Sequence, residues 1–154
     1  MADSPHHGSC QCGGIRYVVH RAHLWCGVCH CTECQKLSTS GFSITVGVQA
    51  DAFEVLAGAP QIWSRIAESG TQVDCYFCRD CGNRIYHLDP EKPQIVRLKT
   101  GTLDDPSIAV PELHAFVRSK LPWVQIPEGV PTFAGQPTLE EATQAILQFR
   151  SANS

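Results

Sequence analysis

Cys29-His30-Cys31-Thr32-Glu33-Cys34 is the stretch on which the prediction of the fold depends. It places three thiols within six residues, a density that a buried cysteine acting as a small hydrophobic side chain does not need. Thiolates that converge on one point are ligands for a soft or borderline metal ion, most often zinc. The stretch therefore predicts a zinc site, and the next question is whether that site keeps a position free for a substrate.

Two further cysteine pairs lie outside this stretch. Cys10-Gln11-Cys12-Gly13 precedes a predicted strand, and Cys78-Arg79-Asp80-Cys81-Gly82 has the form of a zinc knuckle, in which the glycine lets backbone amides approach the sulfur atoms. Structural zinc sites usually take two ligands from each of two separate segments, so that the ion joins distant parts of the chain. We therefore expect one closed structural zinc site, with the ligands Cys10, Cys12, Cys78 and Cys81.

Cys26 leaves two interpretations of the second site. In the first, Cys29, Cys31 and Cys34 hold a second zinc ion and leave one position for catalysis. In the second, Cys26 joins them and makes a closed, purely structural centre. Four ligands within nine residues would have to wrap the ion almost alone, which favours the open site. An open zinc site lowers the pKa of a bound thiol, so that a thiolate forms at neutral pH.

Length and composition are those of a globular protein. The chain has 154 residues, which suits one domain, with 43% hydrophobic and 18% charged residues. A formal net charge of -3 argues against a nucleic-acid partner, and no apolar run approaches the roughly 18 residues of a membrane span. Residues 1–8, with His6 and His7, show no secretion signal and are expected to be a disordered leader. We expect a cytoplasmic location, where the nine cysteines would stay reduced.

Alternating apolar and polar residues predict a mainly β fold of roughly eight to ten short strands. The ranges 53–56 and 61–65 resemble the two strands of a hairpin around Ala57-Gly58-Ala59-Pro60. Composition shifts to Gly, Pro and Thr after Pro127, and a C-terminal helix is predicted from Thr138 to about Arg150. The other predicted strands are 15–19, 42–48, 73–77, 84–87, 95–99 and 113–117, and 35–38 is expected to form one helical turn.

Several of these motifs occur in an order that resembles a known family. The series is Ser9-Cys10-x-Cys12-Gly13, Cys29-His30-Cys31-x-x-Cys34, Phe77-Cys78-x-x-Cys81-Gly82, Gly101-Thr102-Leu103-Asp104-Asp105 and Trp123. It is similar to that of the glutathione-dependent formaldehyde-activating enzymes, a family that also includes centromere protein V. The resemblance implies a β-tent-like fold with two zinc ions over residues 7–124, followed by a linker and C-terminal helix over residues 125–154.

The resemblance also implies the roles of the cysteines. Cys10, Cys12, Cys78 and Cys81 match the structural site, and Cys29, Cys31 and Cys34 match the catalytic one. The expected function is that of a zinc-dependent carbon–sulfur lyase or synthase, which joins glutathione to formaldehyde and gives S-hydroxymethylglutathione. Two alternatives stay open: a non-catalytic interaction module with two structural zinc sites, and a thiol redox sensor that uses Cys26 with Cys29 or Cys75 with Cys78.

Other residues are candidates for substrate contacts. Because glutathione carries two carboxylates, its site should offer cations, and Arg118 with Lys120 is the first pair to consider. His30 could orient the metal site or relay a proton, and His114 could line a pocket. The expected partners are a small thiol and an aldehyde, and a homodimer is compatible with the sequence. The remaining cationic candidates are Arg65, Arg79, Arg97 and Lys99.

Overall fold

The computed structural model describes residues 5–154, so the first four residues of the expected leader lie outside the described part. The described chain packs as two compact units, each built from two separate segments. Unit 1 comprises the residues up to Leu24 together with Val46–Ala109. Unit 2 comprises Trp25–Thr45 together with Val110–Ser154. The observed elements are mainly strands, as predicted, with one longer helix at the C-terminus.

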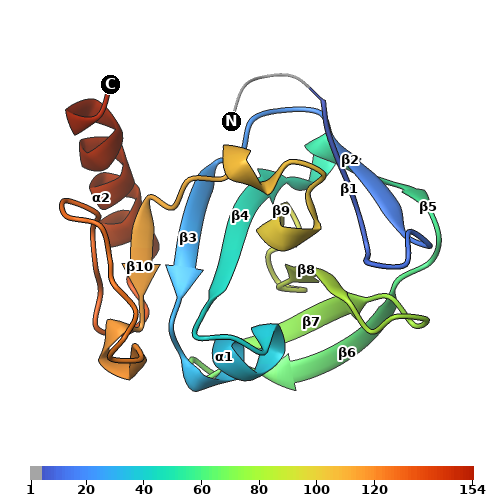
Figure 1. The fold of residues 1–154 in the computed structure, drawn as a ribbon, viewed down its shortest axis with the longest axis horizontal. Coiled ribbons are helices and arrows are strands. Elements are labelled where there is room, and N and C mark those ends of the chain that lie inside the picture. Colours follow the sequence, from blue (N-terminus) through green and yellow to red (C-terminus); the bar gives the residue numbers. More distant parts are fainter. Residues whose placement is uncertain (1–4) are drawn as a thin grey trace. The chain divides into compact units, whose positions relative to one another are not determined.

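Unit 1 contains a three-stranded antiparallel sheet in the order β1-β2-β5 (Figure 1). The strands are β1 (His6–Ser9), β2 (Arg16–Val19) and β5 (Phe53–Ala57). The prediction of a disordered leader is therefore wrong for residues 6–8. They pair with β2, and Gly8 lies so close to the Tyr17 side chain that a β-carbon would stand 2.2 Å from its hydroxyl oxygen.

Four further strands of unit 1 form an antiparallel meander, each strand pairing with the next. They are β6 (Gln61–Ile66), β7 (Gln72–Phe77), β8 (Arg84–Leu88) and β9 (Ile95–Lys99). Aromatic rings join the meander to the three-stranded sheet, because Phe53 of β5 contacts Tyr17 at 5.4 Å and Tyr86 at 4.9 Å between ring centroids. These rings and the fully buried Leu98, the register partner of Tyr86, contribute to the apolar core between the two sheets.

The predicted hairpin between residues 53–56 and 61–65 is wrong. Both strands exist, but β5 pairs with β2 whereas β6 pairs with β7. The connection turns at Gly58, whose φ of 80° is in the left-handed region, and an added β-carbon there would stand 2.4 Å from the Gly14 carbonyl oxygen. The local sequence thus marks a reversal of the chain, but the close approach at Gly58 directs the chain from one sheet into the other.

Unit 2 contains the parallel pair β3 (Trp25–Cys29) and β10 (Leu113–Ala115), with the short helix α1 (Thr32–Ser38) after β3. Strand β3 was not predicted, and α1 is longer than the single turn expected. Strand β4 (Ser43–Gln49) begins in this unit and ends in unit 1. Short 3₁₀ turns occur at Ala50–Ala52, Thr100–Thr102, Pro106–Ile108 and Val117–Ser119.

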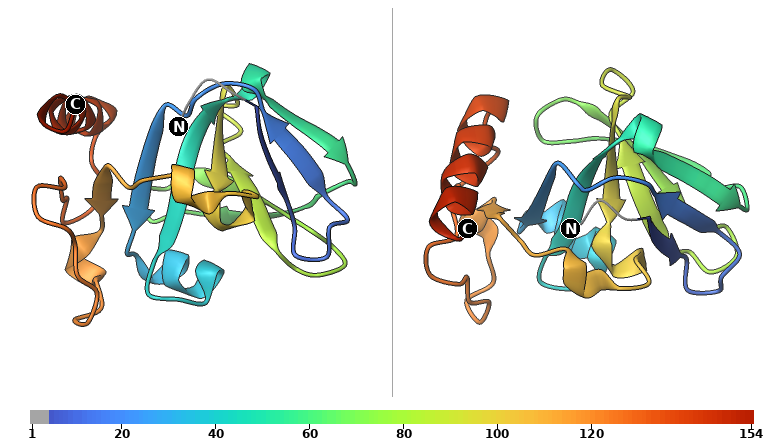
Figure 2. Two further views of the ribbon diagram at one scale, coloured as in Figure 1. Left: turned by 45° about the horizontal axis from the view of Figure 1, so that its top comes forward. Right: turned by 90° about the horizontal axis from the view of Figure 1, so that it is seen from above.

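Helix α2 (Leu139–Ala152) lies beside β10 in both figures that show the whole ribbon (Figures 1 and 2). It begins at a capping box, in which the Thr138 side chain accepts from the Glu141 amide and the Glu141 carboxylate accepts from the Thr138 amide. Ile146 is its buried side chain, and Arg150 forms an ion pair with Glu112. Residues 125–154 thus fall in the same compact unit as 25–45, and a domain boundary at residue 124 stays a prediction.

Candidate functional site

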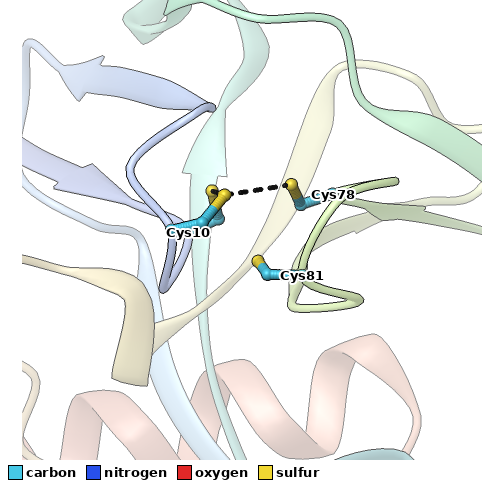
Figure 3. A group of neighbouring side chains, drawn as sticks. Cys10, Cys78 and Cys81 are labelled. Carbon is cyan, nitrogen blue, oxygen red and sulfur yellow. Dashed lines mark hydrogen bonds between the residues drawn. The ribbon is translucent and has the colours of Figure 1, made fainter.

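Unit 1 brings four sulfur atoms together in what we call the four-sulfur site: Cys10, Cys12, Cys78 and Cys81. Their Sγ atoms all lie within 4.8 Å of one another. Figure 3 shows the side chains of Cys10, Cys78 and Cys81 pointing toward one another. The Cys12 Sγ atom lies 3.5 Å from that of Cys10 and 3.7 Å from that of Cys78. These separations are close to the value of about 3.8 Å that four sulfurs at about 2.3 Å from a tetrahedral zinc ion require.

The backbone around this site explains why the sulfurs converge. Gly13 and Gly82 follow the two cysteine pairs, and both have a positive φ, 76° and 73°. That conformation closes two tight turns, in which the Gly13 amide donates to the Cys10 carbonyl and the Gly82 amide to the Cys78 carbonyl. The Gln11 amide donates to the Asn83 side chain at 3.0 Å and so joins the two loops directly.

Backbone donors also prepare the sulfurs for a cation. The Ile15 amide donates to the Cys10 Sγ atom at 3.2 Å. Backbone donors, chiefly the Asn83 amide and then that of Cys12, lower the pKa of the Cys81 thiol to about 6. The loops therefore favour thiolates at Cys10 and Cys81, whereas the neighbouring side chains of Cys10 and Cys78 raise the pKa of Cys12 to about 12.

Unit 2 holds the second group, the three-sulfur site of Cys29, Cys31 and Cys34. Cys29 ends β3, Cys31 is the N-cap of α1, and Cys34 lies in the first turn of that helix. Their Sγ atoms also lie within 4.8 Å of one another, and the Cys34 amide donates to the Cys31 Sγ atom at 3.3 Å. The start of a helix directly after a strand therefore folds the three thiols onto one point.

The thiols of this site cannot all lose their protons without a cation. Hydrogen bonds with the side chains of Cys29 and Cys34 lower the pKa of Cys31 to about 2, while the side chains of Cys31 and Cys34 raise the pKa of Cys29 well above its usual range. One thiolate among these thiols thus suppresses the ionisation of its neighbours, because like charges so close repel. A divalent cation removes that repulsion, so the donor set fits zinc.

Cys26 does not belong to either group of converging sulfurs in residues 5–154. It lies on β3 three residues before Cys29, and side chains alternate between the two faces of a strand, so the two thiols point to opposite faces. Cys26 is fully buried, and burial first and Glu112 second raise the pKa of its thiol to about 12. The arrangement that would close the second site with Cys26 is therefore not the one that the structure has. All nine cysteines are free thiols.

His30 supports the turn between Cys29 and Cys31 and does not point to solvent. Its side chain is fully buried, its Nε2 atom lies 2.8 Å from the His114 Nδ1 atom, and its ring packs edge-on against Phe42. The His30 amide donates to the Ala115 carbonyl, and the Gln35 side chain donates to the His30 carbonyl at 2.9 Å. His114 is thus a hydrogen-bond partner of His30, and not a histidine satisfied by backbone alone.

Two of the cationic candidates already contact groups of the protein itself. Lys120, one of the first pair considered, donates from Nζ to the carbonyls of Leu121 and Val124 at 3.2 and 2.7 Å. Its partner Arg118 stacks over the Phe116 ring at 5.4 Å. In unit 1, by contrast, Arg65 and Arg97 share a sheet face with Arg84 and His87, two residues that the sequence did not single out.

The described residues contain no helix that is long and apolar enough to cross a membrane.

Comparisons with known proteins add the family. The sequence profile of the family described as "Glutathione-dependent formaldehyde-activating enzyme" matches residues 5–119. A protein of Halomonas elongata named "Putative glutathione-dependent formaldehyde-activating enzyme" is 30% identical over 138 residues, which cover 84% of this chain and 87% of that protein. The crystal structure of a Rhodobacter sphaeroides protein is similar in fold, with a TM-score of 0.50 and 22% identity, over 64% of this chain and 87% of that chain. With both cysteine groups within the matched range, the chain belongs to the glutathione-dependent formaldehyde-activating enzyme family.

Proposed function

We propose that this protein joins a thiol to an aldehyde at the three-sulfur site, with glutathione and formaldehyde as substrates and S-hydroxymethylglutathione as product. The observation that carries the proposal is the difference between the two cysteine groups. One offers four sulfurs, as closed structural sites do, whereas the other offers three among the described His, Cys, Asp and Glu side chains. Family membership supports the choice of substrates. The cytoplasmic location and the homodimer stay predictions.

The two groups would hold two zinc ions per chain, a structural ion in the four-sulfur site and a catalytic ion in the three-sulfur site. Bound by Cys29, Cys31 and Cys34, zinc would supply an electrophilic position that lowers the pKa of a substrate thiol to near neutrality. The protein side chains keep the three sulfurs in place for this purpose. The amide of Cys34 and the buried ring of His30 fix the geometry of the turn that carries them.

The reaction itself is an addition without oxidation or reduction. The thiol sulfur forms a bond to the carbonyl carbon of the aldehyde, the carbon–oxygen double bond becomes a single bond, and the thiol proton passes to the oxygen. The reverse reaction breaks the same carbon–sulfur bond, which is why lyase and synthase describe one activity. The hydrogen bonds of Gln35, His30 and His114 preorganise the site, so that less conformational entropy is lost when the substrate binds.

The alternative is a binding module in which both zinc sites are structural. It requires a fourth protein ligand at the three-sulfur site, for which the sequence offers Cys26. The alternation of side chains along β3 and the burial of Cys26 on the other face argue against it. Catalysis at an open site is thus the better-supported function.

Exchange NMR between formaldehyde and S-hydroxymethylglutathione tests the proposal directly. The protein should accelerate the exchange, and Cys31→Ser should remove the acceleration together with one of two zinc ions per chain. The matched control is Cys26→Ser, which should keep both zinc ions and most of the exchange rate. Wild-type exchange in Cys31→Ser, or loss of one zinc ion in Cys26→Ser, would contradict the proposal.

A further inference from the structure

One face of the β6–β9 meander carries a row of neighbouring side chains that ends in cations. Trp63 on β6 stands opposite Cys75 on β7, Cys75 stands opposite His87 on β8, and His87 stands opposite Arg97 on β9. Because side chains two residues apart share a face, Arg65 on β6 lies on the same side of the sheet as Trp63. Four strands thus contribute to a single surface, which we call the cationic face.

His87 lies at the centre of the cationic face with an unsatisfied polar atom. Its side chain is only 4% exposed, and its Nε2 atom is buried without a hydrogen-bond partner in the described chain. Burial first, and then the charges of Lys99, Arg65, Arg84 and Arg97, lower the pKa of His87 to about 2. The imidazole is therefore neutral, and a buried polar atom of this kind is normally paired by water or by a ligand.

Arg84 brings a second unsatisfied donor to the same face. Its guanidinium carbon lies 5.2 Å from the Trp63 ring centroid and 5.6 Å from that of Phe77, so two aromatic rings hold the planar group. The register shift between Tyr76 and Phe77 places Arg84 opposite Phe77. Its Nη1 atom is buried without a hydrogen-bond partner among residues 5–154.

The three arginines of the cationic face, Arg65, Arg84 and Arg97, lack acidic partners in the described chain. Asp74 is the acidic residue of β7, but its neighbours along the strand are Val73 and Cys75, so it points to the opposite face, where it accepts from Ser64 and Gln72. The cationic face is thus a concentration of positive charge that an anion would balance.

We propose that the cationic face is a binding site for a small carboxylate-bearing molecule, held by the planar guanidinium groups of Arg84 and Arg97 with the His87 Nε2–H as a third donor. Guanidinium groups match carboxylate geometry, and an aromatic-stacked Arg is preorganised to bind one. The identification of that molecule with glutathione rests on the proposed function, since glutathione carries two carboxylates. The existence of the site rests on the side chains of the meander alone.

Binding of S-methylglutathione to the zinc-loaded protein tests this site. The methyl group blocks the thiol but leaves both carboxylates, so binding does not depend on the three-sulfur site. Titration calorimetry gives the dissociation constant, and the fluorescence of Trp63, which is 51% exposed and stacks on Arg84, gives a local signal. The diethyl ester of S-methylglutathione, in which the thiol and both carboxylates are blocked, is the ligand control.

The site predicts a loss of affinity of about tenfold or more for Arg84→Gln and for Arg97→Gln, the usual effect of losing one charge-assisted contact. Arg97 is only half-buried, so its variant tests the proposal even if Arg84→Gln lowers stability. The matched control is Arg16→Gln, which removes one exposed positive charge from β2 and should bind as the wild type does. The diethyl ester should bind at least tenfold more weakly than S-methylglutathione.

Two results would overturn the proposal: no binding of S-methylglutathione to the wild type, or equal affinities in the wild type, Arg84→Gln and Arg97→Gln. Failure of the proposed function gives a different pattern. If the wild type shows no formaldehyde exchange but still binds S-methylglutathione through Arg84 and Arg97, the carboxylate site stands and the catalytic proposal falls. Binding that survives in Cys31→Ser would likewise separate the carboxylate site from the three-sulfur site.

Discussion

The ion pair between Arg150 of α2 and Glu112 should contribute about 2 kcal/mol to the stability of unit 2. Glu112 is largely buried, and its carboxylate accepts from the Cys26 amide at 2.9 Å and from Arg150 Nε and Nη2 at 2.5 and 3.0 Å. Breaking a fully buried pair costs about 3–5 kcal/mol, because the remaining charge is buried without its partner. The Arg150 side chain is 43% exposed, so solvent screens the pair and we expect roughly half of that value for Arg150→Met.

Arg150→Met should loosen helix α2 and strand β3 as well as lower the stability of the whole protein. Ile146 is the buried residue of α2, and burial of one such side chain contributes only about 1.5–3 kcal/mol. Loss of the ion pair therefore removes a large share of what holds α2, and the Cys26 amide on β3 loses the fixed orientation of its acceptor. Urea unfolding should give the change in the free energy of unfolding, and hydrogen exchange should show faster exchange of the Cys26 amide.

Matched variants separate this explanation from a general loss of packing. Arg150→Lys keeps the charge but loses the two-pronged geometry, so it should lie between Arg150→Met and the wild type. In Glu112→Gln/Arg150→Met the buried charge is gone, so the double variant should be more stable than the sum of the two single losses predicts. The reasoning is refuted if Arg150→Met unfolds within about 0.5 kcal/mol of the wild type, the range of ordinary surface substitutions.

Three further predictions concern other parts of the chain. Cys26→Ala should retain two zinc ions per chain by metal analysis, because its thiol faces away from the three-sulfur site; a loss of one ion would contradict this. When the pH falls from 8 to 5, the free energy of unfolding should decrease by about 2 kcal/mol less in His87→Gln than in the wild type. The wild type loses this stability because His87 in the unfolded chain takes up a proton below a pKa of about 6.5, whereas in the folded protein it stays neutral until a pKa of about 2. If urea unfolding shows the same dependence of stability on pH in His87→Gln and in the wild type, the prediction is wrong. Gly58→Ala should lower the free energy of unfolding by at least about 2 kcal/mol, because of its φ of 80° and the contact of the new β-carbon with a backbone carbonyl. The control Gly70→Ala, at a φ of 84° in open space, should lower it by only about 1 kcal/mol. Equal losses in the two variants would contradict the role of the contact.

Local patterns predicted most elements of the fold correctly. The alternating runs at 73–77, 84–87 and 95–99 became β7, β8 and β9, and the capping pattern at Thr138 marked the start of α2. What the sequence could not supply was the partner of each strand. The stretch around Gly58 predicted that the chain reverses its direction. Whether β6 then pairs with β5 or with β7 depends on contacts with residues far away in the chain.

In the candidate site, too, the local pattern could be predicted from the sequence but the long-range contacts could not. Cysteine spacing predicted which thiols would meet, and the groups that converge are the two that the sequence suggested. It could not decide the role of Cys26, since that depends on Trp25–Cys29 being a strand, and the glycine in the middle of these residues weakens the β signal. Arg84 and His87 were missed because a basic residue or histidine in a strand is ordinary on its own, and only the pairing of four strands brings them together.

The two sulfur sites also differ in when they can form during synthesis of the chain. All three thiols of the three-sulfur site emerge within six residues, so a metal ion could meet them while most of the chain is still unmade. The four-sulfur site is complete only once Cys81 has been made, and its closure brings together Cys12 and Cys78, which are 66 residues apart. If both sites hold zinc, a shortage during translation would affect them differently: the four-sulfur site needs two distant segments of unit 1, whereas the sulfurs of the three-sulfur site come from one short stretch.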